Sequence, residues 1–163
     1  MRAPQYPWNL NALLRVRPDL GSLMDLCEEN YRVLGRLVPD IRGTKGYQRS
    51  RLDTGLDLHL EVLEQTPYTS LLHLTYYFPH ESGVSPDPDT TFRAYHDAAQ
   101  VEVLDLRQSA LPLPRGPHFP DLCDKWRANL FLSKWLNYCV SQGHRFDSAN
   151  QLPMPDLRFA SSV

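Results

Sequence analysis

The hydrophobic pattern of the chain begins with the period of an α-helix. Apolar residues recur on one helical face at near-heptad spacing, namely Leu20, Leu23, Cys27, Leu34 and Val38, with Met24 and Tyr31 beside them. Asp19 is well placed as the N-cap, and Pro39 ends the segment. The pattern therefore predicts a helix between these two residues.

After a stretch rich in turn residues, the pattern changes to the alternation of a β-strand. Over residues 56–62, leucine and valine alternate with polar residues, namely Asp57, His59 and Glu61. This is typical of a strand that is buried on one face. A shorter strand over 47–52 is expected before it, with a hairpin turn at 53–55. A third strand follows the turn at 64–67 and runs over 71–78.

Two proline-rich stretches interrupt the second half of the chain. Residues 79–89 hold three prolines and one glycine, and we expect an exposed loop there. Two further strands are expected over 92–97 and 100–106, joined by Ala98 and Ala99. Residues 111–120 carry four prolines, which indicates an extended connector.

The last regular segment is again helical. Asp121 is placed to cap it, Gly143 to end it, and an apolar stripe runs through Ala128, Leu132, Trp135, Leu136 and Cys139. Phe131 and Tyr138 lie on a flank of this helix. Such a flank packs into the core or, alternatively, against a second copy in a homodimer.

The order of elements predicts a two-layer α+β fold. It consists of an antiparallel meander of four to five strands, with an N-terminal and a C-terminal helix packed on one face. Because the strands alternate apolar and polar residues, the second sheet face should be open or only partly covered. We divide the chain into an N-terminal arm (1–18), a single domain (19–146) and a loose C-terminal tail (147–163).

Size and charge narrow the class of protein. The 163 residues suit one domain that can bury a core without disulfides. The net charge is −2, so no overall positive field attracts nucleic acid or an anionic membrane. We therefore expect neither nucleic acid nor membrane as a partner.

The cysteines and the N-terminus bear on the cellular compartment. The three cysteines are far apart and show no spacing typical of a metal site. Reduced thiols suit the cytoplasm, although a redox pair is the alternative. The N-terminal region has no apolar run of signal-peptide length, and no segment approaches the length of a membrane span. A cytoplasmic location follows from these features.

Four separated segments resemble a known family. They are Leu26-Cys27-Glu28-x-Asn30-Tyr31, Glu64-x-Thr66-x-Tyr68-Thr69, Arg93-x-Tyr95-His96-Asp97-Ala98 and Trp135-Leu136-x-Tyr138-Cys139. Their order and spacing over about residues 20–143 are similar to the YqiB-like family, a bacterial domain of unknown function. The resemblance brings no established activity. Its members lie beside genes of nucleotide metabolism, which implies a nucleotide-like ligand by association only.

The segment Tyr95-His96-Asp97 is the strongest candidate for acid–base chemistry, because a carboxylate can orient an imidazole. In a regular strand, however, successive side chains point to opposite faces, so His96 and Asp97 do not meet. Phe92, Ala94 and His96 would face the helices, and Arg93, Tyr95 and Asp97 the other side. We favour a structural role for His96, and keep His96, Asp97 and Glu64 as the candidates for catalysis.

The open sheet face offers a candidate binding surface. Arg93 can bind an anion in a bidentate manner and Tyr95 can stack on a ring. The same face carries His59, Glu61 and His73. If the hairpin centres near Thr66, His59 lies opposite His73, and the two could hold a divalent metal. No third ligand has a recognisable spacing, so we favour a polar face in water and expect no metal or other cofactor.

The turn at 64–69 supplies a further candidate, Tyr68. The hydroxyl groups of Thr66, Tyr68 and Thr69 could line the rim of a pocket. Alternatively, Glu64 and the threonines satisfy the amides of the turn, which is the interpretation we favour.

No phosphate-binding glycine loop, serine nucleophile elbow or HExxH motif is present in the sequence. The preferred hypothesis is a small-ligand-binding or regulatory module that uses the open sheet face. The alternative is a small hydrolase or transferase acting on a nucleotide-like substrate. It requires His96 as a solvent-accessible acid or base close to Asp97 or Glu64. A third hypothesis is an adaptor that binds partners through residues 152–159.

Overall fold

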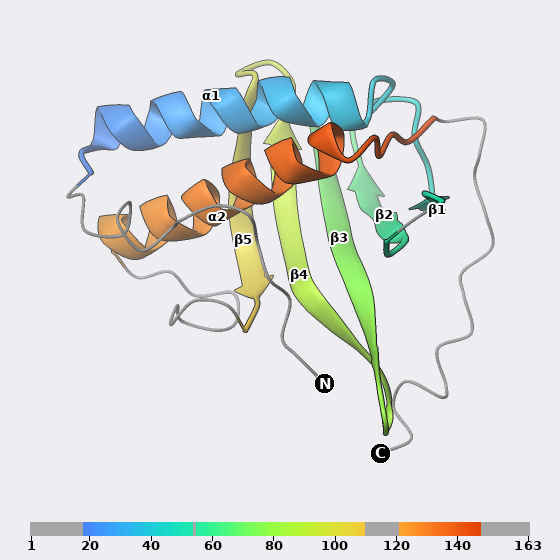
Figure 1. Ribbon diagram of the computed structural model, residues 1–163. Coiled ribbons are helices and arrows are strands. Elements are labelled where there is room, and N and C mark those ends of the chain that lie inside the picture. Colours follow the sequence, from blue (N-terminus) through green and yellow to red (C-terminus); the bar gives the residue numbers. More distant parts are fainter. Residues whose placement is uncertain (1–17, 54, 110–120, 148–163) are drawn as a thin grey trace.

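The described residues form a single antiparallel sheet with two helices. In a computed structural model, residues 18–53, 55–109 and 121–147 are described. The elements are, in chain order, α1 (Leu20–Leu37), β1 (Tyr47–Ser50), β2 (Leu58–Gln65), β3 (Thr69–His80), β4 (Gly83–Tyr95), β5 (Gln100–Arg107) and α2 (Leu122–Ser141). The strand order β1-β2-β3-β4-β5 is a simple meander, and both helices lie on the same side of it (Figure 1). The predicted α+β fold is confirmed.

Helix α1 begins and ends where its sequence predicts. The carboxylate of Asp19 accepts a hydrogen bond from the backbone N–H of Ser22 at 2.7 Å, which caps the first turn. This bond lowers the pKa of Asp19. At the other end, the N–H of Val38 donates to the carbonyl of Leu34 at 2.7 Å, directly before Pro39.

Helix α2 is also capped as its sequence predicts. Asp121 accepts from the N–H of Asp124 at 2.8 Å, and Gly143 has a φ of +98° just beyond the C-terminus. The predicted apolar stripe, from Ala128 to Cys139, is almost completely buried. Phe131 lies in the core as well, and Tyr138 packs against it.

The core fills the space between the sheet and the two helices. The inward side chains of the strands are almost fully buried and include Leu58, Leu60, Leu72, Leu74, Phe92, Val101, Val103 and Leu106. Each such side chain contributes about 1.5–3 kcal/mol by leaving water. Within the described ranges, neither helix lies against the opposite sheet face (Figure 1). We call this second surface, with the outward side chains of its strands, the open face.

The prediction of an exposed loop over residues 79–89 is wrong. Strands β3 and β4 pair almost to their tip, with Pro79 opposite Val84 and Tyr77 opposite Pro86. The hairpin therefore extends beyond the helices (Figure 1). A proline lacks the N–H of a regular ladder, but it is tolerated at an irregularity in the pairing. Such an irregularity lies between Thr75 and Tyr77, and the Thr75 hydroxyl donates to the carbonyl of Pro88 at 2.7 Å.

The other strand boundaries differ from the prediction by a few residues, and some predictions remain untested. The predicted strands over 47–52 and 56–62 correspond to β1 and β2. Gly55, in the turn between them, has a φ of +96°, which suits glycine. The predicted connector over 111–120 lies outside the described residues, and so do the predicted arm over 1–18 and tail over 147–163, apart from residues 18 and 147. Neither described helix is sufficiently long and apolar to cross a membrane.

Candidate functional site

The register of the strands arranges the open face in rows of polar side chains. One row crosses all five strands and consists of Tyr47, Glu61, His73, Thr91 and Asp105. The adjacent row consists of Arg49, His59, Thr75, Asp89 and Arg107. The predicted candidates His59, Glu61, His73, Arg93 and Tyr95 therefore share one surface, whereas Tyr68 lies in the turn at its end.

The expected pairing of His59 with His73 is wrong. His59 lies opposite Thr75, and His73 lies opposite Glu61. The hairpin turn is centred one residue further along the chain than Thr66, and this moves the opposing residue by two positions. No group of three metal-ligating side chains occurs among the residues that the structure describes.

His59 is held in a largely apolar and aromatic environment. Its Nδ1 is hydrogen-bonded to the hydroxyl of Tyr47, and the ring of Tyr77 lies edge-on at 4.8 Å between centroids. Burial lowers the pKa of His59 to about 4 and raises that of Tyr47 to about 12. Both side chains are therefore neutral near pH 7, and His59 supplies no charge to bind an anion.

Other polar and charged side chains of the open face contact one another. The imidazole of His73 contacts the carboxylate of Asp89, with both side chains largely buried. At the β1 edge, Arg49 lies 3.7 Å from Asp57, and at the β5 edge Arg107 lies 3.7 Å from Asp105. These contacts neutralise the periphery of the face.

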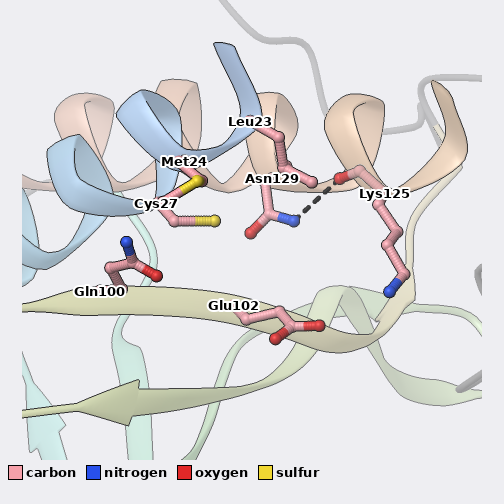
Figure 2. Close-up of a pocket in the computed structure, with 7 residues that line it drawn as sticks. All are labelled: Leu23, Met24, Cys27, Gln100, Glu102, Lys125 and Asn129. Atoms are coloured by element: carbon pink, nitrogen blue, oxygen red, sulfur yellow. Dashed lines mark hydrogen bonds between the residues drawn. The ribbon is translucent and has the colours of Figure 1, made fainter. Parts of the chain in front are cut away.

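Arg93 differs from these groups because it has no counter-ion. Its Nε is buried without a hydrogen-bond partner, and in the described part of the chain no carboxylate lies within 4.0 Å of its guanidinium. Glu102 is its cross-strand neighbour on β5, but this side chain lines a cavity beside the helices (Figure 2). Tyr95, two residues along β4, points to the same face as Arg93. The two form the part of the face best suited to an anion and a ring.

His96 belongs to the core side of the sheet, as the alternation predicts. It is 7% exposed, and both ring nitrogens meet hydroxyl groups: Nδ1 lies 3.0 Å from the Tyr31 hydroxyl and Nε2 lies 2.8 Å from that of Ser70. Burial lowers the pKa of His96, with a smaller contribution from Arg42, whereas Asp97 acts in the opposite direction. The imidazole is enclosed by α1 and β3.

The residues expected to assist His96 lie elsewhere. Asp97 is exposed and accepts a hydrogen bond from the N–H of Ala98 at 3.0 Å, so it begins the turn to β5. Glu64 is exposed on β2. The hydrolase hypothesis requires an accessible imidazole beside one of these carboxylates. The structure does not show this arrangement for His96.

A chain of buried hydrogen bonds continues from His96. The hydroxyl of Ser70 donates to Oε1 of Gln65, whose amide nitrogen donates to the carbonyls of Ile41 at 2.9 Å and Thr44 at 3.2 Å. Because the Ser70 proton is given to Gln65, His96 Nε2 must donate to Ser70, and Nδ1 must accept from Tyr31. Because His96 donates to Ser70 in this series of hydrogen bonds, it cannot act as a base toward Ser70.

Our sequence analysis did not identify Ser70 and Gln65 as partners of His96. A signal was present, since Ser70 occupies the first inward position of β3, ahead of Leu72 and Leu74, and a polar side chain there needs a buried partner. These hydrogen bonds join α1, the end of β4 and the turn before β3. Three of the four segments that carry the family resemblance lie there.

The turn before β3 holds Tyr68 in a fixed position. The Thr66 hydroxyl accepts from the N–H groups of Tyr68 at 3.3 Å and Thr69 at 3.0 Å, as the structural interpretation of this turn predicts. The carbonyl of Tyr68 accepts from the N–H of His96 at 2.8 Å, and its side chain is 66% exposed. An anchored backbone thus presents an exposed aromatic ring.

The cysteines are free thiols, and two of them are buried. Burial raises the pKa of Cys27 to about 11 and that of Cys139 to about 12. Cys139 also contacts the hydroxyl of Tyr76 at 3.5 Å. These two thiols therefore remain protonated near pH 7 and behave as small apolar side chains.

Comparisons with known proteins point to one family. Residues 33–145 match the family model described as "Protein of unknown function (DUF1249)". The chain is similar to the uncharacterised protein YqiB of Escherichia coli K12 and of Escherichia coli O157:H7, with 35% identity over 138 residues in each case. The match covers 79% of this chain and 94% of the relative. No solved structure matches the chain.

Proposed function

This chain belongs to the DUF1249 family of proteins of unknown function, and we propose that it is a non-catalytic module that binds a small anionic ligand on the open face. The resemblance of four sequence segments to the YqiB-like family and the match to the family model indicate the same family, and neither supplies an activity. The proposal therefore depends on the chemistry of the open face alone.

The observation that carries the proposal is the unpaired guanidinium of Arg93. A buried or half-buried cation without a counter-ion loses hydration without gaining a partner, so it is costly unless an anion binds. The arginines at the two edges of the face, Arg49 and Arg107, already have carboxylate partners. An incoming phosphate or carboxylate would find its complementary charge at Arg93.

The surroundings of Arg93 favour a ligand that also carries a ring. Tyr95 lies on the same face, and the exposed ring of Tyr68 lies at the end of the adjacent strand. Aromatic rings of this kind stack on bases and sugars, and Glu61 and the neighbouring His73 can bond hydroxyl groups. A nucleotide-like anion suits this set.

The free thiols fit a reducing compartment such as the cytoplasm.

The proposal is tested by binding measurements on the Arg93→Gln variant. The probes are inorganic phosphate, nucleoside monophosphates and sugar phosphates, first in a thermal-shift screen and then by calorimetry. Because a hydrogen bond to a charged group is worth about 1.5–3 kcal/mol, we expect the affinity for the ligand found to fall by at least about tenfold. The stability of the variant should change by less than about 0.5 kcal/mol.

Arg107→Gln is the matched control, because Arg107 lies on the same face but is paired with Asp105 at the sheet edge. It should bind the ligand like the unaltered protein. A large loss of stability in Arg93→Gln would show that Arg93 is structural. Equal loss of affinity in both variants would show a general effect of charge, and either result contradicts the proposal.

A further inference from the structure

A cavity lies between the two helices and the β5 edge of the sheet. Its volume is about 170 Å³, and its walls come from α1, β5 and α2 (Figure 2). The lining residues are Leu23, Met24, Cys27, Gln100, Glu102, Lys125 and Asn129. Arg93 and Tyr95 do not line the cavity, although Glu102 and Gln100 are their cross-strand neighbours on β5.

One wall of the cavity is apolar. Leu23, Met24 and Cys27 come from the first turns of α1, and Met24 is 46% exposed whereas Cys27 is 6% exposed. The Cys27 thiol has its pKa raised to about 11 by burial and, secondarily, by the charge of Glu102. It is therefore protonated near pH 7 and forms a neutral, apolar surface.

The opposite wall is polar and rigidly held. Asn129 Oδ1 accepts from the N–H of Val103 at 3.0 Å, and its Nδ2 donates to the carbonyl of Lys125 at 2.8 Å. The Asn30 side chain in turn donates to the carbonyl of Asn129 at 3.0 Å. These bonds fix α2 against both β5 and α1, so the cavity is formed before any ligand binds.

The cavity brings together two opposite charges that do not pair with each other. Glu102 lies on β5 and Lys125 extends from α2 toward that strand (Figure 2). For the described stretches, neither side chain has an ion-pair partner within 4.0 Å. A carboxylate and an ammonium group beside a neutral apolar wall are therefore available to a ligand.

We propose that this cavity is a second binding site, for a small zwitterion such as an α-amino acid with an aliphatic side chain. Its ammonium group would bind Glu102, its carboxylate would bind Lys125, and its hydrocarbon part would contact Leu23, Met24 and Cys27. A ligand with one charge satisfies one of the two side chains and leaves the other unpaired. The pair of charges therefore selects for a zwitterion against simple amines and acids.

The volume of the cavity limits the size of the ligand. An engineered protein cavity of about 150 Å³ accommodates benzene, which has six non-hydrogen atoms. Pockets for drug-sized molecules measure about 300–1,000 Å³. A cavity of about 170 Å³ therefore suits a molecule of amino-acid size and excludes a nucleotide.

The test uses three compounds that share one hydrocarbon chain. Norvaline carries both charges, butylamine lacks its carboxylate, and pentanoate lacks its ammonium group. Each is titrated into the ¹⁵N-labelled full chain, and the amide signals are followed, including those of the Asn129 side chain. We expect norvaline to shift the signals of the cavity residues, and the other two compounds to bind at least about tenfold more weakly.

Two substitutions locate the site. Glu102→Gln and Lys125→Met each remove one charge at similar volume, and each should weaken norvaline binding by at least about tenfold. Glu64→Gln and Lys134→Met are the matched controls, since they make the same changes at positions outside the cavity, and they should leave binding unchanged.

The inference is overturned if norvaline, alanine and leucine all leave the cavity signals unshifted at tens of millimolar. It is also overturned if butylamine or pentanoate binds as tightly as norvaline, or if binding survives both cavity substitutions. The thermal midpoints of the four variants are measured alongside, so that a loss of binding is accepted only from a folded protein.

Discussion

The role of His96 is decided by the hydroxyl groups on either side of its ring. Tyr31 and Ser70 occupy both nitrogens, and the imidazole is buried against α1. A buried polar group of this kind stabilises the fold when every partner is present and costs free energy when one is removed. The histidine therefore connects the first helix to β3 and to the end of β4.

Removing the Tyr31 hydroxyl should lower the free energy of unfolding. In the Tyr31→Phe variant, His96 Nδ1 loses its hydrogen-bond partner although the histidine is only 7% exposed, and the free energy of unfolding should fall by about 1–2 kcal/mol. Urea denaturation measures the change. Tyr68→Phe is the control, because that ring is 66% exposed, and it should alter stability by less than about 0.5 kcal/mol. Equal effects of the two substitutions would contradict the role given to His96.

A second prediction for a single residue concerns how the free energy of unfolding depends on pH. The pKa of His59 is about 4 in the folded protein, whereas the ordinary value in an unfolded chain is 6.5. Between these values the unfolded state binds the additional proton, so the stability that His59 contributes is complete above about pH 6.5 and is lost as the pH falls toward about 4. His96 and His144, whose pKa values are also lowered by burial, act in the same direction.

The measurement is a series of urea denaturations between pH 7 and pH 4. In His59→Gln, the fall of the unfolding free energy with decreasing pH should be shallower than in the unaltered protein. An unchanged slope in His59→Gln would mean that this imidazole takes up its proton at the same pH in the folded and unfolded states, which contradicts the prediction.

At the scale of elements, the helices were predictable from the sequence because their signals are local. Asp19 and Asp121 cap them, and the apolar stripes have the helical period. The β3–β4 hairpin was not predictable, because Pro79, Pro86 and Pro88 indicate a loop unless the pairing partner is known. A proline can occupy a strand where the ladder is irregular, and that irregularity is a property of two strands together.

The ends of the helices provide a matched pair of glycine substitutions. Gly143 follows α2 with a φ of +98°, so alanine there should lower the free energy of unfolding by about 1 kcal/mol. Gly35 lies inside α1 with nothing near its missing Cβ, so Gly35→Ala should raise stability by about 0.5–1 kcal/mol. Thermal denaturation compares the two. A stabilised Gly143→Ala would contradict the helix C-terminus described for α2.

At the scale of the whole molecule, the sequence was sufficient for the two layers and the open face but not for the contacts within that face. Alternation alone assigns His59, His73 and Arg93 to one surface. The identity of each neighbour depends on the centre of the turn, and a displacement of one residue replaced His73 by Thr75 opposite His59. The lack of a counter-ion for Arg93 and the cavity at β5 depend on three-dimensional packing, which no local pattern contains.

The bond between Asn129 and Val103 has a consequence for how molecules of this protein meet one another. Strand β5 is an edge strand of the sheet, and an unprotected edge strand can pair with a strand of another molecule and so lead to aggregation. Here the outward amide of Val103 is already occupied by a side chain of α2. The other edge strand, β1, has only four residues, and Arg49 projects from it. Both edges of the described sheet are therefore unfavourable for the growth of fibrils.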